Sequence, residues 1–377
     1  PLWSRGLGDV YKRQAQQIET PCSKHICAEH RIRGNASNHF IVLLPSISVE
    51  KVESLDVDAV WPSVSVVMPV RNEATHISEA VDAILAQKYE GDLDIWIAVA
   101  PSDDATERLV AELARGHNNL YWVRNGAGIT PVGLNAAISA SSGRVIVRVD
   151  GHAKLCDGYI SRAVRTMVRT GAANVGGRQL AVGVTGFEKA VAAVMMSAIG
   201  SGGAEYRVGE TEKAVDTVFL GVFDRRAGDE VGWFDESLIR NQDYELNIRL
   251  RHAGGLGWFD PNLFVEYRPR SSLRAVGRQY FDYGLYKAKV RRLHRSSWKI
   301  RQVLPPVTLS MLALSLVVGV WFMPALLVAL AYFVAVSVGV RGSVVTRARA
   351  LLIAPVMHFS WSFGLLTGFL RFRWRTS

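Results

Sequence analysis

The chain has 377 residues, enough for a full hydrophobic core and about two domains. Its 49% hydrophobic residues and 10 tryptophans exclude an intrinsically disordered protein. The net charge of +10 points to an anionic partner such as a membrane surface or a nucleic acid. The three cysteines, Cys22, Cys27 and Cys156, offer no second pair for a zinc site and are predicted to be reduced thiols.

Residues 1–60 form a poorly patterned N-terminal region, which we set apart from the fold. The sequence begins with proline rather than methionine, so this end is expected to be incomplete, processed or an artefact. From residue 64 onward, apolar runs alternate with segments of helical spacing. The predicted strands are 64–69, 94–100, 120–123 and 144–149, and the predicted helices are 73–85, 104–114 and 130–140.

This alternation predicts an α/β fold with a mostly parallel sheet and helices on both faces. Ligands of such sheets bind beyond the carboxyl ends of the strands. Pro69, Ala100 and Asp150 all lie at those ends. The sequence therefore places a candidate site there.

The pattern changes after Asp150. An edge strand and turn are predicted at 173–177, an apolar helix at 187–199 and a mobile loop at 201–214. Two short turn-bounded segments follow, at 217–221 and 232–235, and then an amphipathic helix at 242–252. We find no internal repeat and no low-complexity segment.

The C-terminal part of the chain combines a basic aromatic segment, residues 268–302, with a region that is expected to cross a membrane, residues 303–377. Residues 303–340 contain no Asp, Glu, Lys or Arg, about twice the length needed for one crossing. Pro324 lies near the middle of this run, which predicts two helices joined by a tight turn. The expected crossings are 303–322, 325–340 and 350–370, the last containing His358.

Basic residues before a first membrane helix favour a cytoplasmic catalytic domain and attraction to anionic lipids. Nucleic-acid binding by the same residues is the disfavoured alternative, because the apolar runs explain where the charge lies. The sequence leaves the membrane topology of the last segment undecided. A third crossing would place Arg371 outside, and the segment could instead lie along the membrane or re-enter it.

Three polar groups carry the predicted chemistry. Asp150 and His152 follow a buried strand and suit Mn²⁺ or Mg²⁺ held mainly through substrate phosphates, although a plain Asp-Gly turn with a surface histidine fits the same residues. Asp243 begins a helix and could act as a general base, a role compatible with capping that helix.

Other polar residues near the strand ends are candidate substrate contacts. Asn72 and Glu73 could read a base or ribose or form an N-cap pair, and Asp104 could cap a helix or contact a nucleotide. Asn135 could face the phosphates or be a solvated helix residue. The remaining predicted substrate-binding residues are Pro69, Arg71, Gly221 and Gln242. No Walker sequence, Gly-x-Gly-x-x-Gly after the first strand or Gly-x-Ser-x-Gly motif is present.

Over residues 62–306 these features resemble the inverting glycosyltransferases of family 2, which have the GT-A fold. The motifs that carry the resemblance are Val66-Val-Met-Pro-Val-Arg-Asn-Glu73, Pro101-Ser-Asp-Asp-Ala-Thr106, Gly133-Leu-Asn-Ala-Ala137, Arg148-Val-Asp-Gly-His152 and Asn241-Gln-Asp243. Two further segments, Arg268-Pro-Arg270 and Gln279-Tyr-Phe-Asp-Tyr-Gly284, are similar to the succinoglycan-type membrane transferases.

The resemblance implies a GT-A nucleotide-diphospho-sugar transferase domain at residues 61–267, followed by membrane helices. It implies Asp243 as catalytic base, Asp150 and His152 as ligands of Mn or Mg, a nucleotide-sugar donor, and a polyprenyl-linked saccharide acceptor in exopolysaccharide synthesis. It further implies a multi-pass protein of the bacterial inner membrane that has membrane lipid as a partner and binds no nucleic acid.

The sequence departs from the family pattern at three positions. Ala100 replaces an Asp that often holds uracil, His152 ends the metal motif where Asp is usual, and Gln242 stands where Glu is common. A Gln-x-x-Arg-Trp motif is absent at the place where processive synthases carry it, which favours transfer of a single sugar. The alternatives are a polyprenyl-phosphate sugar synthase and a non-catalytic nucleotide-sugar binding protein.

Overall fold

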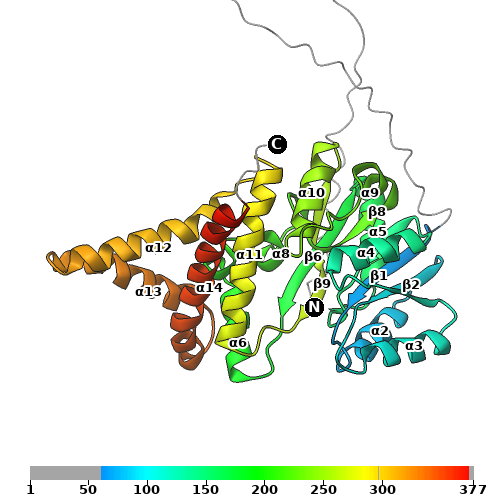
Figure 1. Ribbon diagram of the computed structural model, residues 1–377, viewed down its shortest axis with the longest axis horizontal. Coiled ribbons are helices and arrows are strands. Elements are labelled where there is room, and N and C mark those ends of the chain that lie inside the picture. Colours follow the sequence, from blue (N-terminus) through cyan, green and yellow to red (C-terminus); the bar gives the residue numbers. More distant parts are fainter. Residues whose placement is uncertain (1–60, 296, 373–377) are drawn as a thin grey trace, which may run out of the picture. The chain divides into compact units, whose positions relative to one another are not determined.

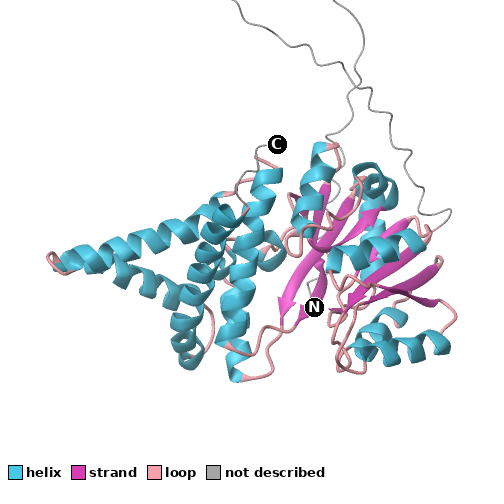
Figure 2. Cartoon of the chain, in the orientation of Figure 1, coloured by secondary structure: helices cyan, strands magenta, loops and turns pink. Residues whose placement is uncertain are grey.

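A computed structural model describes residues 61–295 and 297–372, so the N-terminal region with Cys22 and Cys27 lies outside the described residues. Residues 64–148 contain a parallel sheet, as predicted (Figures 1 and 2). Its strands are β1 (Val64–Val70), β2 (Leu93–Val99), β3 (Leu120–Arg124) and β4 (Val145–Arg148). They lie in the order β3-β2-β1-β4, which brings the ends of β1 and β4 side by side.

Helices cover both faces of this sheet. On one face, α2 (Ile77–Leu85), α3 (Thr106–Gly116) and α5 (Tyr159–Thr170) pack with the strands in one buried apolar cluster. On the other, α4 (Thr130–Ala140) and α10 (Gln242–His252) pack in a second cluster. Residues with helical spacing on these elements, such as Ile77 and Leu134, are fully buried, as an amphipathic pattern requires.

The second half of the sheet is mixed. Its strands are β5 (Lys154–Leu155), β6 (Asn174–Ala181), β7 (Lys213–Val215), β8 (Phe219–Asp224) and β9 (Gly257–Tyr267), and the helix α9 (Arg225–Val231) follows β8. Only β6 and β9 pair in parallel here, while β8 runs antiparallel to both β4 and β6. The expectation of a mostly parallel sheet therefore holds for residues 64–148 and fails beyond them.

The prediction of an edge strand at 173–177 was wrong, because β6 lies inside the sheet between β8 and β9. Its glycines suggested an edge, but they serve close packing. A Cβ at Gly177 would lie 1.9 Å from the carbonyl oxygen of Leu263 on β9. Small residues are needed at this position so that two interior strands can approach each other.

The prediction of a mobile loop at 201–214 was also wrong in part. The apolar helix before it is α6 (Gly186–Met195), and α7 (Ala198–Ser201), α8 (Glu205–Val208) and β7 follow. Arg207 on α8 is buried. The segment is thus packed against the rest of the domain rather than free of it.

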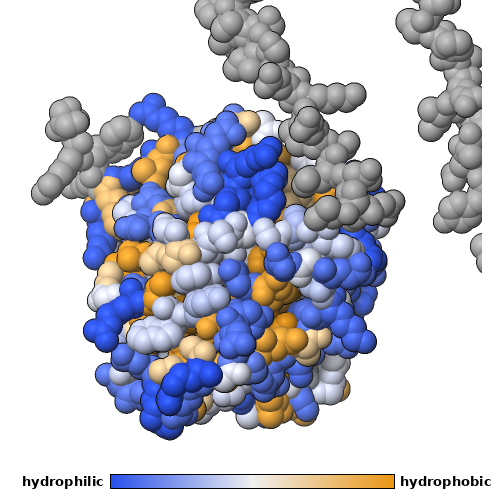
Figure 3. All heavy atoms as spheres, turned by 90° about the vertical axis from the view of Figure 1, so that its right-hand side faces the viewer, coloured by the Kyte–Doolittle hydropathy of each residue, from blue (hydrophilic) through white to orange (hydrophobic). Residues whose placement is uncertain are grey.

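The C-terminal part is helical: α11 (Leu273–Leu293), α12 (Ile300–Gly319), the 3₁₀ turn η1 (Met323–Leu326), α13 (Leu327–Gly339) and α14 (Val344–Arg371). Pro324 lies in η1 between α12 and α13, at the predicted turn. Within the described residues, α12 and α14 are long and apolar enough to cross a membrane, and the apolar segment Met323–Gly339 is shorter. Many apolar side chains of α12 and α13 are exposed, whereas the visible face on the α2 and α3 side of the molecule is mostly hydrophilic (Figure 3).

The basic helix α11 lies against α14 with the backbones in close approach (Figure 1). A Cβ at Gly284 would lie 2.0 Å from the carbonyl oxygen of Trp361, and one at Gly364 would lie 2.0 Å from that of Phe281. Small residues at a helix–helix contact permit such backbone approach in apolar surroundings. The basic segment is therefore tied to the apolar helices as one packed unit.

We expect Gly284→Ala to destabilise this contact by about 1–3 kcal/mol, because the added methyl meets backbone that cannot give way. Gly277→Ala on the same helix is the matched control, since its nearest contact is the Ser360 Oγ atom at 3.3 Å. Alanine gains about 1 kcal/mol of helix propensity over glycine, so the control should be neutral or slightly stabilising. Thermal unfolding in detergent compares the two, and equal melting temperatures would contradict the close approach.

Candidate active site

Asp150 and His152 lie just past the end of β4, beside the end of β1. Val149 continues the parallel pairing by donating its backbone N–H to the Val67 carbonyl at 3.1 Å. Gly151 then fits where a Cβ would lie 2.8 Å from Val70 Cγ1. The two polar side chains therefore project from a turn that is packed tightly against the β1 strand end.

His152 is held by Glu73, from the loop after β1. Its Nδ1 atom lies 2.8 Å from Glu73 Oε1, and both side chains are partly buried. This hydrogen bond raises the pKa of His152 above its ordinary value, although burial opposes the shift. Engagement of Nδ1 leaves Nε2 as the free nitrogen. Glu73 thus orients the imidazole, a role that differs from the base or ribose contact expected from the sequence.

Asp150 and Asp243 lie on either side of one buried guanidinium. Arg148, only 6% exposed, donates from one terminal nitrogen to Asp150 Oδ1 at 3.1 Å, and its other terminal nitrogen lies 3.6 Å from Asp243 Oδ2. Burial acts to raise the pKa of Asp150, but the charges of Arg148, His152 and Arg240 together with the hydrogen bond from Arg148 outweigh it and hold that pKa below its ordinary value. The two carboxylates, 93 residues apart in the sequence, therefore converge on one guanidinium.

Arg148 was missed by sequence reasoning. The available signal was an arginine inside an otherwise apolar buried strand, since a buried charge requires partners. Both of its partners proved to be predicted site residues.

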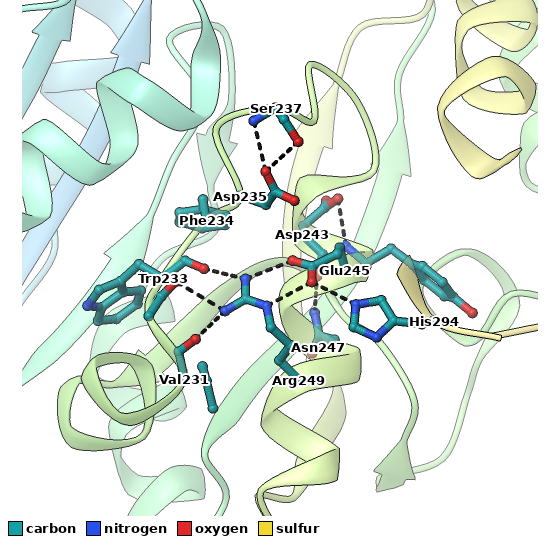
Figure 4. A network of polar contacts seen from close by, with 12 residues as sticks. Val231, Trp233, Phe234, Asp235, Ser237, Asp243, Glu245, Asn247, Arg249 and His294 are labelled. Atoms are coloured by element: carbon teal, nitrogen blue, oxygen red, sulfur yellow. Dashed lines mark hydrogen bonds and ion pairs between the residues drawn. The ribbon is translucent and has the colours of Figure 1, made fainter. Parts of the chain in front are cut away.

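Asp243 is positioned by the start of α10, whose bounds match the predicted 242–252. Asn241 precedes the helix with φ +62° and donates its side-chain amide to the Tyr283 carbonyl at 3.0 Å. One turn on, Glu245 accepts from Arg249 and contacts His294 at 2.8 Å (Figure 4). Arg249 also donates to carbonyls of the 231–233 segment, so the helix that carries Asp243 is fixed at its first turn.

A cavity of about 660 Å³ opens onto these groups. Four predicted site residues line it: Asp150, His152, Gln242 and Asp243. The other predicted residues lie outside its lining: Pro69, Arg71, Asn72, Glu73, Asp104, Asn135 and Gly221.

The loops after β1 and β2 bind each other. Asn72, with φ +54°, accepts from the Asp103 backbone at 2.8 Å and donates its own N–H to Ser102 Oγ at 3.1 Å. Asp104 accepts hydrogen bonds from the Thr106 hydroxyl and from the backbone N–H groups of Thr106 and Ala74. The bond from the Thr106 hydroxyl contributes most to holding the pKa of the Asp104 carboxyl below its ordinary value. Asp104 therefore links the two loops and lies one residue before the N-cap position of α3, Ala105, so neither of its two predicted roles is confirmed.

Two of the remaining residues have structural partners. Asn135 donates to the Phe234 carbonyl at 2.9 Å and accepts from the Phe234 N–H at 3.1 Å, so it clamps the segment before α10 rather than being solvated. Gly221 is buried with φ +104°, and a Cβ there would lie 2.5 Å from the Phe223 ring. Pro69 is partly buried at the end of β1, and Arg71 is exposed beside it.

The side chains present fit a cation that is coordinated mainly by a bound substrate and water rather than by the protein. Within residues 61–295 and 297–372, no group of three or more His, Cys, Asp or Glu side chains could hold a metal ion. Asp150 and His152 would supply two donors, and substrate phosphates and water would complete the coordination, as is common for Mg²⁺ and Mn²⁺. The carboxylate that holds His152 Nδ1 is the usual support of a metal-binding imidazole.

We expect Glu73→Gln to weaken divalent-cation binding about 10- to 100-fold, because the imidazole loses the partner that orients it. If His152 ligates the cation, binding needs its neutral form. Binding by the parent is then complete above the raised pKa of His152 and is lost as the pH falls through that pKa. The variant should bind more weakly at high pH, with its midpoint at lower pH. Titration with Mn²⁺ at a series of pH values measures the affinity and the pH midpoint. Glu79→Gln, at an exposed position on α2, is the matched control.

Comparisons with known proteins bear on this geometry. Residues 65–232 match the family model described as glycosyl transferase family 2. The succinoglycan biosynthesis protein ExoA of Rhizobium meliloti (strain 1021) is 30% identical over 325 residues, which cover 83% of this chain and 96% of the relative. A dolichyl N-acetyl-alpha-D-glucosaminyl phosphate 3-beta-D-2,3-diacetamido-2,3-dideoxy-beta-D-glucuronosyltransferase of Methanococcus voltae is 24% identical over 322 residues, 82% of this chain and 97% of that protein.

The mannosyltransferase PcManGT from Pyrobaculum calidifontis, solved in complex with GDP-Man and Mn²⁺, shares the fold. Its TM-score is 0.54 at 18% identity, covering 84% of this chain and 91% of that one. The GT-A fold expected from the motifs is thereby confirmed. A family match over residues 65–232, together with a 30% identical relative aligned over almost its whole length, shows that this chain is a glycosyltransferase and belongs to glycosyltransferase family 2.

Proposed function

We propose that the protein transfers a single sugar, with inversion, from a nucleotide-diphosphate donor to a lipid-linked saccharide in the synthesis of an extracellular polysaccharide or related glycan. The observation that carries the proposal is the convergence of Asp150 and Asp243 on Arg148 at the wall of one cavity. An inverting displacement needs a group that stabilises the leaving diphosphate and, close by, a base for the acceptor.

Asp243 is the base in this proposal. Its carboxylate takes the proton of an acceptor hydroxyl, whose oxygen attacks the anomeric carbon on the face opposite the diphosphate. The new glycosidic C–O bond forms as the bond to the diphosphate breaks, and the configuration inverts in one step. Arg148 keeps the Asp243 carboxylate turned toward the Asp150 end of the cavity.

The donor would lie at the ends of β1, β2 and β4. Pro69 lies near the end of β1, and Arg71, Asn72 and Asp104 belong to the loops that follow β1 and β2. A divalent cation held by Asp150 and His152 would neutralise the leaving diphosphate, and the Mn²⁺ and GDP-Man of the Pyrobaculum calidifontis structure support a cation and a nucleotide sugar. Gln242 lines the acceptor side of the cavity, whereas Asn135 and Gly221 would act through the backbone they hold.

The apolar helices support a reaction that takes place at a membrane. We propose a multi-pass protein of the bacterial inner membrane, with α12, α13 and α14 in the bilayer and the sheet domain in the cytoplasm. The exposed apolar side chains of α12 and α13 and the basic residues of α11 support this arrangement. The names of the relatives, one in succinoglycan biosynthesis and one acting on a dolichyl phosphate sugar, support a lipid-linked acceptor.

A donor screen tests the proposal. The full chain in lipid nanodiscs is supplied with Mn²⁺, each of several nucleotide sugars, and a polyprenyl-diphosphate-linked sugar. The expected product is a lipid carrying one more sugar, with inverted anomeric configuration by NMR. A sugar phosphate lipid formed from polyprenyl phosphate alone would identify a polyprenyl-phosphate sugar synthase instead. Failure to turn over any donor would favour a non-catalytic binding protein.

A further inference from the structure

Two basic side chains, Arg207 of α8 and Lys287 of α11, line the same cavity. Neither belongs to the sequence motifs described above, and neither has a role in the proposed chemistry. Arg207 of α8 is 7% exposed and lines the cavity. One terminal nitrogen donates to the Tyr280 hydroxyl at 3.2 Å, and the guanidinium lies 5.6 Å from the Tyr206 ring centroid. Its Nε–H is buried and has no hydrogen-bond partner.

This arginine has no counter-charge. Among the residues that the structure describes, no Asp or Glu oxygen lies within 4.0 Å of Arg207, whereas the similarly buried Arg148 contacts two carboxylates. An unpaired buried charge is costly, so positions of this kind are retained where a ligand supplies the opposite charge.

Lys287 of α11 is a second buried basic side chain that has no carboxylate within 4.0 Å among the described residues. It is 4% exposed, lines the same cavity, donates to the Ser297 carbonyl at 3.2 Å and lies over the Tyr244 ring. Burial lowers the pKa of Lys287 to about 7. An anion beside it would restore the charged form. Arg301 differs, because Asp216 already pairs with it at 3.5 Å.

The far wall of the cavity comes from the helices proposed to lie in the membrane, and it is mostly apolar beyond the first residues of α12. Arg301 and Gln302 line the cavity at the start of α12, and the other lining residues from these helices are mostly apolar or aromatic: Leu304, Pro305, Thr308, Tyr332, Met357, His358 and Trp361. The whole lining carries six Lys or Arg side chains against two carboxylates. One cavity thus joins catalytic carboxylates, two unpaired buried cations and an apolar wall.

We propose that Arg207 and Lys287 bind the phosphate or diphosphate of the acceptor lipid, whose apolar chain lies along α12, α13 and α14. This inference rests on the proposed function and names the site that holds the acceptor. A nucleotide sugar fits the far wall poorly, because its base and ribose would face apolar side chains. The anion at Arg207 would leave the attached saccharide to extend toward Asp243, which lines the same cavity.

The test is a binding measurement that needs no sugar transfer. The full chain in nanodiscs is titrated with farnesyl diphosphate, farnesol, inorganic diphosphate and dioleoyl phosphatidate. A chelator is present throughout to suppress cation-dependent binding at Asp150 and His152. We expect farnesyl diphosphate to bind at least ten-fold more tightly than each of the other three, because only it combines a diphosphate with a prenyl chain.

Variants assign the site. Arg207→Gln should weaken farnesyl diphosphate binding about 10- to 100-fold, the usual cost of one charge-assisted hydrogen bond, and Arg207→Lys should restore part of it. Lys287→Met should weaken it less. Arg115→Gln, on the exposed end of α3, is the matched control and should bind like the parent. If Arg207→Gln does not fold, protection of α8 from hydrogen exchange by farnesyl diphosphate in the parent gives the same answer.

Three results would overturn the inference: unchanged affinity in Arg207→Gln, equal binding of inorganic diphosphate, or tighter binding of phosphatidate, which would indicate a bulk-lipid site. These failures are distinguishable from failure of the proposed function. If the protein turns over donor but does not bind farnesyl diphosphate at Arg207, only this inference is wrong. If the protein binds farnesyl diphosphate but turns over no donor, only the proposed sugar transfer is wrong.

Discussion

Asp243→Asn is expected to abolish sugar transfer to a hydroxyl acceptor, with a loss of about 10²- to 10⁴-fold in rate. The amide keeps the shape of the side chain and can still accept from the Tyr244 backbone, as the carboxylate does at 2.9 Å. It cannot take a proton. Donor binding should therefore be retained while the chemical step is lost, and single-turnover transfer of a radiolabelled sugar measures this.

Asp235→Asn is the matched control. It makes the same chemical change in the segment just before α10, where Asp235 accepts from the backbone and hydroxyl of Ser237 (Figure 4). This variant should transfer sugar at close to the parent rate. If Asp243→Asn is also nearly as active as the parent, no strong base is needed and the acceptor is a phosphate rather than a hydroxyl.

Asp150→Ala is expected to lower metal-dependent donor turnover by at least about a hundred-fold. The change removes a proposed cation ligand, and stabilisation of leaving-group charge by a metal is worth several kcal/mol. Chelation of the parent should have a similar effect, reversed by Mn²⁺. Because imidazole is a softer ligand than carboxylate, Mn²⁺ should restore more activity than Mg²⁺. Donor turnover against cation concentration is the measurement.

Loss of Asp150 also removes one partner of the buried Arg148, so the fold must be checked alongside the activity. Asp243 remains within reach of that guanidinium, and we expect a folded variant with a modestly lower melting temperature. Asp157→Ala, at an exposed position in the same loop region, is the control and should keep full turnover. Parent-like turnover by a folded Asp150→Ala protein would show that the cation is not held there.

Local patterns predicted the first half of the domain well. The segment 130–140 and the segment 242–252 have the predicted bounds, and the strands before Asp150 differ from prediction by a residue or so at their ends. These elements have clear apolar periodicity or a buried run, which is a property of neighbouring residues. The convergence of Asp150 and Asp243 was also predicted, from motif order rather than from contacts.

Prediction failed where a residue's role depends on a partner far along the chain. The glycines of β6 suggested an edge strand, yet β8 and β9 enclose it. The glycines at 202–203 suggested a free loop, yet α8 buries Arg207 within it. Glycine has the same local signature whether it permits motion or close packing, so only the neighbouring backbone distinguishes the two.

The sequence by itself determined which segments become strands and helices, and that polar groups would gather at one edge of the sheet, because alternation and strand ends are properties of neighbouring residues. Only the tertiary structure decided that Arg148 joins the two carboxylates, that Glu73 holds His152, and that Arg207 and Lys287 are buried without counter-charges. Those facts are contacts between side chains distant in the sequence. Burial and charge pairing are set by the packed neighbours in space, which no local pattern records.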